Sequence, residues 1–227
     1  DKWKDYPGLV IRPDTYFQNV KNASRWSYNE MLSQLGKPVD RSRWGMTPPT
    51  VNAYYSPVMN EIVFPAGILQ FPFFHPEADD AYNYGAIGAV IGHEISHGFD
   101  DSGSQYDKDG TLRNWWTPED RKKFEAKAKL LQEQFDGYTI LDSLHVNGKL
   151  TLGENIGDLG GLNAAYEAFK MTPQGKSNEK IDGFTPDQRF FLAWAQIWRS
   201  NTLPDRAAQL IVTDTHSPDS FRAIGAP

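Results

Sequence analysis

The chain has 227 residues, of which 39% are apolar and 13% aromatic, so it can bury a sizeable core and is not intrinsically disordered. Its net charge of -6 and scattered lysines and arginines argue against a nucleic-acid partner, and the absence of cysteine excludes disulfides and thiolate metal ligands. No apolar run approaches the ~20 residues that cross a bilayer. Because no repeat or low-complexity tract divides the chain, we expect one domain over residues 1–227.

The first hundred residues are predicted to form a helix, two short strands and a second, buried helix. The amphipathic stretch 16–35 precedes a proline-rich connection, after which 51–56 and 61–64 have the composition of paired strands. From about 77 to 99, small and aliphatic residues predict a largely buried helix that ends near Gly98.

The rest of the chain is predicted to be mainly helical. Thr117 and Pro118, followed by two acidic residues, are typical of a helix start, and this helix is expected to reach about Phe135. Further predicted elements are a hairpin turn at Asn147-Gly148, a polar loop over 171–185, and helices over 155–170, 187–200 and 204–212. The sum is a helix-rich α+β fold with a small sheet.

Two of the five histidines lie four residues apart in the stretch VIGHEISHGFD. Because residues i and i+4 share one face of a helix, His93 and His97 can bind one metal ion together. Glu94 lies beside the first histidine, where it can accept a proton from an attacking water rather than bind the metal. This pattern occurs by chance in roughly one such chain in two hundred, so further ligands are needed to support it.

A second segment, GENIGDLGG, supplies the missing groups. A catalytic zinc takes three protein ligands and leaves a fourth position open, and a carboxylate usually holds the other N–H of each ligating histidine. Glu154 is therefore predicted as the third ligand, with Asp100 and Asp158 holding the histidines. Asp100 follows His97 by three residues and is expected to hold that ring, leaving Asp158 for His93, but the sequence leaves this pairing open.

Two other classes of metal site fail on spacing. A three-histidine metzincin site requires glycine and histidine at the positions where this chain has Asp100 and Gly103. Aligning Gly110 with the sixth position of an EF-hand loop places Gln105 first and Trp116 twelfth, where Asp and Glu belong. We therefore expect neither a metzincin site nor a calcium loop.

Six motifs occur in a fixed order along the chain: VNAYYSP, EIVFPAGILQ.PFF, NYG.IG.VIGHEISHGFDD, YDKDG.L.NWW, LGENIGDLGGL and D.HSP..FR.IG. They span about 51–225, and in this order they resemble the catalytic half of the neprilysin and endothelin-converting-enzyme family of zinc endopeptidases. The resemblance implies a thermolysin-like gluzincin fold and one zinc ion per chain. It also implies hydrolysis of oligopeptides on the amino side of hydrophobic residues.

The resemblance assigns the reaction to groups on the HExxH and ExxxD motifs and on the last motif. The implied zinc site consists of His93, His97 and Glu154 as ligands, Glu94 as general base, and Asp100 and Asp158 as the carboxylates that orient the histidines. The groups assigned to catalysis itself are Glu94, His216 and Asp158, with His216 stabilising the oxyanion. A histidine side chain is a suitable hydrogen-bond donor to such a developing charge.

The resemblance also implies how a peptide substrate is held. Asn52 and Ala53 would hold the substrate backbone, and Arg222 would bind a substrate carbonyl. An extended Asn-Ala segment can pair with a peptide as an added strand. The pocket for the residue after the cut would be lined by apolar side chains, namely Ile68, Phe73, Val90, Ile197 and Trp198.

Members of this family carry a large, mainly helical region upstream that closes over the active site, and a short tail after the arginine, and this sequence contains neither. The expected partners are therefore oligopeptide substrates and that upstream region of the same protein. Since the vertebrate members are rich in disulfides, a chain without cysteine favours a bacterial relative. We expect it to be exported to the periplasm or cell surface rather than cytoplasmic.

These observations predict a zinc metalloendopeptidase in which Glu94 takes a proton from water and passes it to the leaving amine, without a covalent intermediate. The alternative is a non-catalytic peptide-binding or scaffold module that keeps zinc for stability. Glu94 is not needed to hold a metal, so its presence favours the enzyme.

Overall fold

A computed structural model describes residues 5–227 and divides into two compact units, Asp1–Arg43 and Trp44–Pro227. In its described part, the first unit contains one helix, α1 (Tyr16–Leu32), which ends three residues before the predicted boundary. The Trp26 indole N–H donates to the Pro7 carbonyl over 2.9 Å, so the segment before the helix lies along it. The bounds of the catalytic domain, expected at residues 1 and 227, stay a prediction.

The second unit opens with the predicted pair of strands. β1 (Tyr54–Ser56) and β2 (Glu61–Val63) are antiparallel, with Tyr54 opposite Val63. The chain then forms the short 3-10 helix η1 (Ala66–Ile68) before it enters the helical body.

The predicted buried helix consists of three consecutive pieces: α2 (Asp80–Asn83), the π-helical turn η2 (Tyr84–Gly88) and α3 (Ala89–Ser96). It begins where the Asp79 carboxylate accepts the Tyr82 amide over 2.9 Å, an N-cap that sequence analysis did not identify. A π-helical turn is rare and occurs frequently at functional sites. The helix ends at Ser96, close to the predicted end at Gly98.

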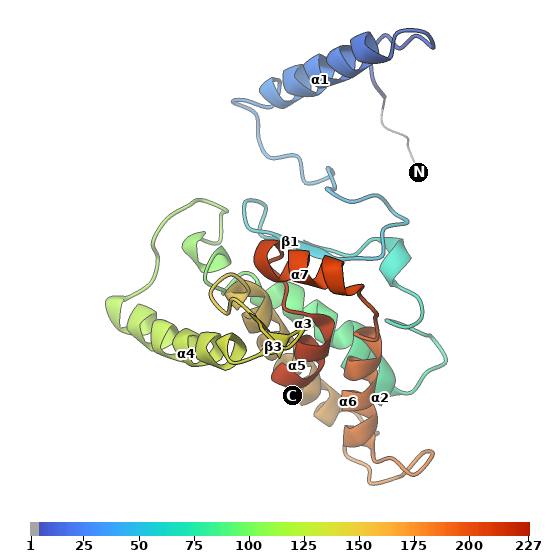
Figure 1. The fold of residues 1–227 in the computed structure, drawn as a ribbon, viewed down its shortest axis with the longest axis vertical. Helices are drawn as coiled ribbons and strands as arrows, with labels where there is room; N and C mark the ends of the chain where they lie inside the picture. Colours follow the sequence, from blue (N-terminus) through green and yellow to red (C-terminus); the bar gives the residue numbers. More distant parts are fainter. Residues whose placement is uncertain (1–4) are drawn as a thin grey trace. The chain divides into compact units, whose positions relative to one another are not determined.

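The helix α5 (Leu152–Met171) crosses α3 at very short range and begins one turn before the predicted start near residue 155. A Cβ atom on Gly92 of α3 would lie 2.7 Å from the Cα atom of Gly161 on α5, so only glycine fits at this crossing. Figure 1 shows the two helices side by side in the middle of this unit. The close crossing brings together the two motifs with i, i+4 spacing.

The helix α6 (Pro186–Ile197) packs against α2 and η2 and closes the larger hydrophobic core. Thr185 and Gln188 cap its start reciprocally, as in a capping box. The buried members of the core come from α2, α3, α5 and α6: Ala81, Ala89, Leu162, Ala165, Phe169, Phe190 and Trp194. The sequence predicted this helix over 187–200, and the observed helix ends three residues earlier.

A second core cluster lies under α4 (Pro118–Asp136) and α7 (Pro204–Thr213), both close to their predicted ranges. Thr117 caps α4 by accepting the amide of Asp120, with Pro118 at the first helical position as predicted. Before α4, residues Gly103–Gln105 form the 3-10 helix η3.

The predicted hairpin turn at Asn147-Gly148 is wrong. The hairpin is formed by β3 (Thr139–Ile140) and β4 (Leu144–His145), and it turns at Leu141 and Asp142, where φ is 49° and 62°. Gly148 instead lies against α4, where a Cβ atom would come within 2.3 Å of the Gln132 carbonyl oxygen. The Asn-Gly pair therefore marks a close approach of two segments.

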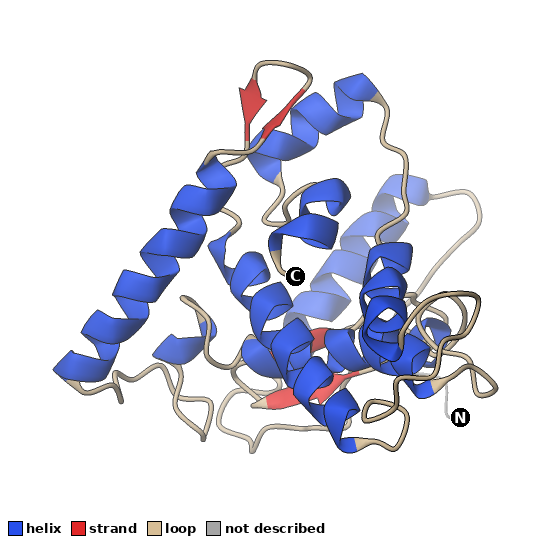
Figure 2. Ribbon diagram, turned by 90° about the horizontal axis from the view of Figure 1, so that it is seen from below, coloured by secondary structure: helices blue, strands red, loops and turns tan. Residues whose placement is uncertain are grey.

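The last element, α8 (Asp219–Gly225), was not predicted from the sequence. Figure 2 shows that helices dominate and that the two pairs of strands lie apart from each other. This confirms the predicted helix-rich α+β class, although the strands form two separate two-stranded sheets and not the one small sheet expected. Within residues 5–227, no helix combines the length and apolar character that a membrane span requires.

Candidate active site

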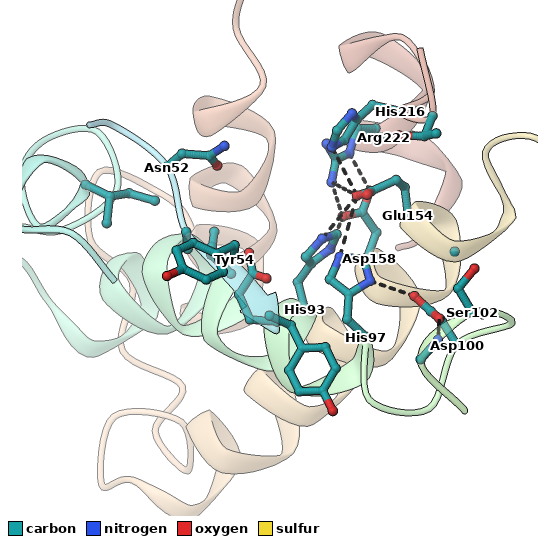
Figure 3. Close-up of a pocket in the computed structure, with 18 of the residues that line it drawn as sticks. Asn52, Tyr54, His93, His97, Asp100, Ser102, Glu154, Asp158, His216 and Arg222 are labelled. Atoms are coloured by element: carbon teal, nitrogen blue, oxygen red, sulfur yellow. Dashed lines mark hydrogen bonds and ion pairs between the residues drawn. The ribbon is translucent and has the colours of Figure 1, made fainter. Parts of the chain in front are cut away.

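The crossing of α3 and α5 brings three potential metal ligands to one point. Glu154 Oε2 lies 3.2 Å from His93 Nε2 and 3.8 Å from His97 Nε2, and the three atoms all lie within 4.8 Å of one another. The side chains come from different helices but point toward one another (Figure 3). Among residues 5–227, this is the only cluster of its kind with metal-binding spacing.

A carboxylate holds each histidine ring through its other nitrogen. His93 Nδ1 lies 2.9 Å from Asp158 Oδ1, and His97 Nδ1 lies 2.7 Å from Asp100 Oδ2. If each Nδ1 carries the proton, each Nε2 presents its lone pair to the shared point. The pairing that the sequence left open is therefore Asp158 with His93 and Asp100 with His97.

The two orienting carboxylates are themselves fixed. Asp100 Oδ1 accepts the backbone amides of Ser102 and Gly103 over 2.8 Å and 2.7 Å. Asp158 accepts two hydrogen bonds of 2.7 Å from the Arg222 guanidinium, in the bidentate geometry that suits this pair. Burial alone would raise the pKa of Asp158, but the charge and hydrogen bonds of Arg222 hold it below its usual value.

The residues present fit a zinc ion. Glu154 Oε2 is buried and accepts no well-aligned hydrogen bond, although the Nε2 atoms of three histidines lie within 3.8 Å of it. Burial opposes a charge on His93, yet its hydrogen bond to the Asp158 carboxylate and the nearby Glu154 carboxylate raise its pKa to about 9. A buried anion and an imidazole that favours the cationic form show that the site needs positive charge. Two imidazoles and one carboxylate are a common ligand set of catalytic zinc.

Glu94 lies beside the three ligands and lines the same cavity. Its side chain is buried, and burial raises the pKa of its carboxyl group above the usual value. A raised pKa makes the carboxylate a stronger base than one in water. The position is therefore suited to proton transfer next to the metal point.

The cavity has a volume of about 570 Å³ and is lined by most of the substrate-binding residues expected from the sequence. In the view of Figure 3, Asn52 lies on one side, and His216 and Arg222 lie on the other. The remaining expected residues that line it are Ala53, Ile68, Phe73, Val90 and Trp198. Ile197 does not line the cavity, because it packs against the core around Phe190 and Trp194.

His216 reaches the site from the loop between α7 and α8. Its Nε2 lies 3.2 Å from Glu154 Oε2, and its side chain is 49% exposed. Asp214 Oδ1 accepts the His216 backbone amide over 2.9 Å and lies 2.7 Å from its Nδ1. Sequence analysis did not identify Asp214, although an aspartate two residues before a candidate catalytic histidine could have indicated it.

Arg222 occupies a different position from a free substrate-binding group. It is buried, forms both hydrogen bonds to Asp158, and stacks its guanidinium 3.9 Å from the centre of the Trp198 ring. This stacking and pairing fix the side chain beside the cavity. A substrate carbonyl could therefore use only its remaining N–H groups.

Comparison with known proteins identifies the family. The profile of peptidase family M13 matches residues 52–227. The chain is 45% identical over 225 residues to an endothelin-converting enzyme homolog of Locusta migratoria, covering 98% of this chain and 31% of that protein. It is 46% identical over 227 residues to endothelin-converting enzyme 1 of Homo sapiens, covering 99% and 29%.

Solved structures agree in fold. The zinc metalloprotease Zmp1 of Mycobacterium tuberculosis, crystallised with an inhibitor, is 52% identical with a TM-score of 0.92, covering 99% of this chain and 35% of that one. PepO from Lactobacillus rhamnosis is 37% identical with a TM-score of 0.85, covering 96% and 33%. The chain thus spans about a third of the length of these relatives.

These similarities confirm the gluzincin-type α+β fold and the neprilysin-like zinc metalloendopeptidase family expected from the sequence. They also imply zinc as the metal for the three-ligand cluster. The chain belongs to peptidase family M13.

Proposed function

We propose that this chain carries the catalytic centre of a zinc-dependent endopeptidase that cuts oligopeptides on the amino side of hydrophobic residues. One observation carries the proposal: His93, His97 and Glu154 converge on one point, both rings are held by carboxylates, and Glu94 lines the same cavity. One zinc ion per chain, bound by these three residues, would lower the pKa of water to ~7 and polarise the scissile carbonyl.

Glu94 is the general base in this proposal. Its carboxylate accepts a proton from the attacking water and returns it to the leaving amine, so no covalent intermediate is needed. The burial that raises the pKa of Glu94 favours the first of these transfers, because it makes the carboxylate a stronger base. Asp158 and Asp100 act through the histidines by fixing the orientation of each ring.

The walls of the cavity hold and polarise the substrate. Asn52 and Ala53 pair with the peptide backbone as it lies along the segment before β1, as a strand added to an edge would. His216 donates to the oxyanion that develops on the scissile carbonyl. Arg222 binds a substrate carbonyl through the N–H groups that Asp158 does not engage.

Specificity resides in the apolar part of the cavity. Four of its side chains, Ile68, Phe73, Val90 and Trp198, present hydrocarbon surface to the residue after the cut, and Ile197 supports them from the core. Burying a large apolar side chain there stabilises the complex by about 1.5–3 kcal/mol. Peptides should therefore be cut before Phe, Leu, Ile or Val, and mass spectrometry of the products would refute this if cuts clustered before Asp, Lys or Gly.

The substitution Glu94→Gln tests the function directly. It should preserve zinc binding, since Glu94 is not a ligand, but lower peptide hydrolysis by ~10²-fold or more. Glu167→Gln is a matched control on the exposed face of α5 and should change neither quantity. Equal hydrolysis by Glu94→Gln would refute Glu94 as the general base. An unmodified protein that binds zinc and peptide but does not hydrolyse the peptide would favour the alternative, a peptide-binding or scaffold module with a structural zinc.

The rest of the protein is proposed to complete the cleft. Relatives are about three times as long as this chain, and we propose that an additional helical region of the same protein covers the cavity and restricts it to oligopeptides. Water exclusion and contacts from two walls raise the rate. The test is to compare kcat/KM for a short peptide and for a folded protein, with and without that region. If the region changes kcat/KM for neither substrate, the proposal is refuted.

Export to the periplasm or cell surface stays a prediction that cell fractionation can test.

A further inference from the structure

The residue after His216 makes a buried contact that the proposed mechanism does not use. Ser217 is 2% exposed, and its hydroxyl donates to Asn155 Oδ1 over 2.8 Å. Asn155 lies on α5 immediately after Glu154 and is 1% exposed. A hydrogen bond between two buried side chains thus joins the loop that carries His216 to the helix that carries the third metal ligand.

The acceptor in this contact is held in place. Asn155 Nδ2 donates to Thr151 Oγ1 over 2.9 Å, and the Thr151 hydroxyl donates to the Asn147 carbonyl over 3.2 Å. The amide nitrogen is therefore committed to Thr151, which leaves the amide oxygen facing Ser217. Hydrogen bonds between buried side chains, such as those of Ser217, Asn155 and Thr151, favour one arrangement of these residues.

His216 depends on such a contact because it is not held by packing. Half of its side chain is exposed, and Asp214, which orients its ring, lies on the same loop. Asp214 can therefore fix the ring relative to the loop, but it cannot fix the loop relative to α5. Ser217 can, since its partner is adjacent in sequence to Glu154.

We propose that Ser217 and Asn155 are positioning residues that hold His216 at the distance from Glu154 at which its ring faces the oxyanion. This inference rests on the proposed function, in which His216 stabilises that charge. A displacement of a catalytic group by about 1 Å can lower a rate by as much as 10²-fold. The Ser217 hydroxyl therefore influences the rate of the reaction through the placement of His216.

The test is Ser217→Ala in the zinc-loaded protein at its natural length. We expect kcat to fall by roughly 10-fold, with KM and zinc content unchanged. In a His216→Ala background, Ser217→Ala should have little further effect, because the group that it positions is already absent. Thr213→Val is the matched control, since it removes a hydroxyl hydrogen bond at the end of α7 without affecting Asn155.

A binding measurement separates positioning from general stability. A phosphinic peptide carries a tetrahedral oxyanion, whereas a product peptide does not. Ser217→Ala should therefore weaken the binding of the phosphinic peptide by about the factor by which it lowers kcat. The affinity for the product peptide should stay unchanged. If Ser217→Ala does not fold, Ser217→Cys retains the size and a weak donor and permits the same comparison.

Two results would overturn the inference while leaving the proposed function intact. One is an unchanged kcat in Ser217→Ala, and the other is an equal loss in the wild-type and His216→Ala backgrounds, which would indicate a purely structural contact. An unmodified protein without peptidase activity would refute the proposed function and, with it, this inference.

Discussion

The two sides of the cavity are built in different ways. On one side, α3 and α5 cross at Gly92 and Gly161, and the groups around the metal point are buried and hydrogen-bonded. On the other side, His216 is half exposed on a loop held by side-chain hydrogen bonds. The proposed metal ligands are therefore positioned by helix packing, whereas the proposed oxyanion donor is positioned by a few polar contacts.

The largest effect on stability and zinc affinity should come from replacing Asp158, on the buried side of the cavity. Asp158→Ala leaves the buried Arg222 guanidinium without its partner and His93 without its orienting group. We expect the free energy of unfolding to fall by about 3–5 kcal/mol and the zinc affinity to fall by about 10- to 100-fold. Denaturant unfolding and zinc titration measure the two quantities.

The control is Asp187→Ala, which removes a partly exposed ion pair with Lys170. It should cost about 1 kcal/mol or less. If Asp158→Ala were as mild as this control, Asp158 would not secure the buried side.

The opposite side should respond in rate and not in stability. His216→Ala should lower kcat by about 10²- to 10³-fold, because it removes the proposed donor to the oxyanion, while zinc content and KM stay nearly constant. Steady-state kinetics and metal analysis check this. Loss of zinc on this substitution would make His216 a ligand and remove Glu154 from that role.

The metal-free protein should lose stability as the pH rises. The pKa of His93 is raised to about 9 in the folded protein, against about 6.5 when unfolded, so its contribution is complete below pH 6.5 and lost as the pH rises through 9. The loss is roughly 3 kcal/mol. Urea unfolding at several pH values measures it.

Zinc-loaded protein is the control for this pH dependence. His93 is neutral as a ligand, so the fall attributable to His93 should be absent when zinc is bound. The same fall with zinc bound would show that another group is responsible.

A smaller effect is expected from the helix crossing itself. In Gly161→Ala, the new Cβ atom would lie 2.4 Å from the His93 backbone nitrogen, so α3 and α5 must separate. We expect a loss of about 1–3 kcal/mol in the free energy of unfolding, with weaker zinc binding. Gly137→Ala, where the nearest atom lies at 3.3 Å, should be nearly neutral. Equal thermal and chemical stability of the two variants would contradict the close crossing.

The buried side of the site could be predicted from sequence because helix geometry is local. The i, i+4 spacing of His93 and His97 places both on one face whatever surrounds them, and Glu154 and Asp158 repeat the spacing. The pairing of each histidine with its aspartate could not be predicted, because it depends on how α3 and α5 cross. That crossing is fixed by contacts between residues about 70 positions apart in the sequence.

The loop side was predicted only through the family resemblance. Nothing local indicates that Ser217 bonds Asn155, since the partners lie 62 residues apart. Arg222 was expected to be a substrate-binding group, and the structure adds that it is the buried partner of Asp158. The hairpin prediction failed for a related reason: Asn147-Gly148 has the composition of a turn, but it serves a contact with α4.

The proposed function requires His93, His97 and Glu154 to hold one zinc ion at the crossing of α3 and α5. Anomalous diffraction from a crystal of the zinc-loaded protein, recorded on both sides of the zinc absorption edge, tests it most directly. We predict one peak per chain, about 2.0–2.2 Å from one nitrogen of each histidine and one oxygen of Glu154. A peak bound by other side chains, or no peak at this point in a zinc-loaded and active protein, would contradict the account.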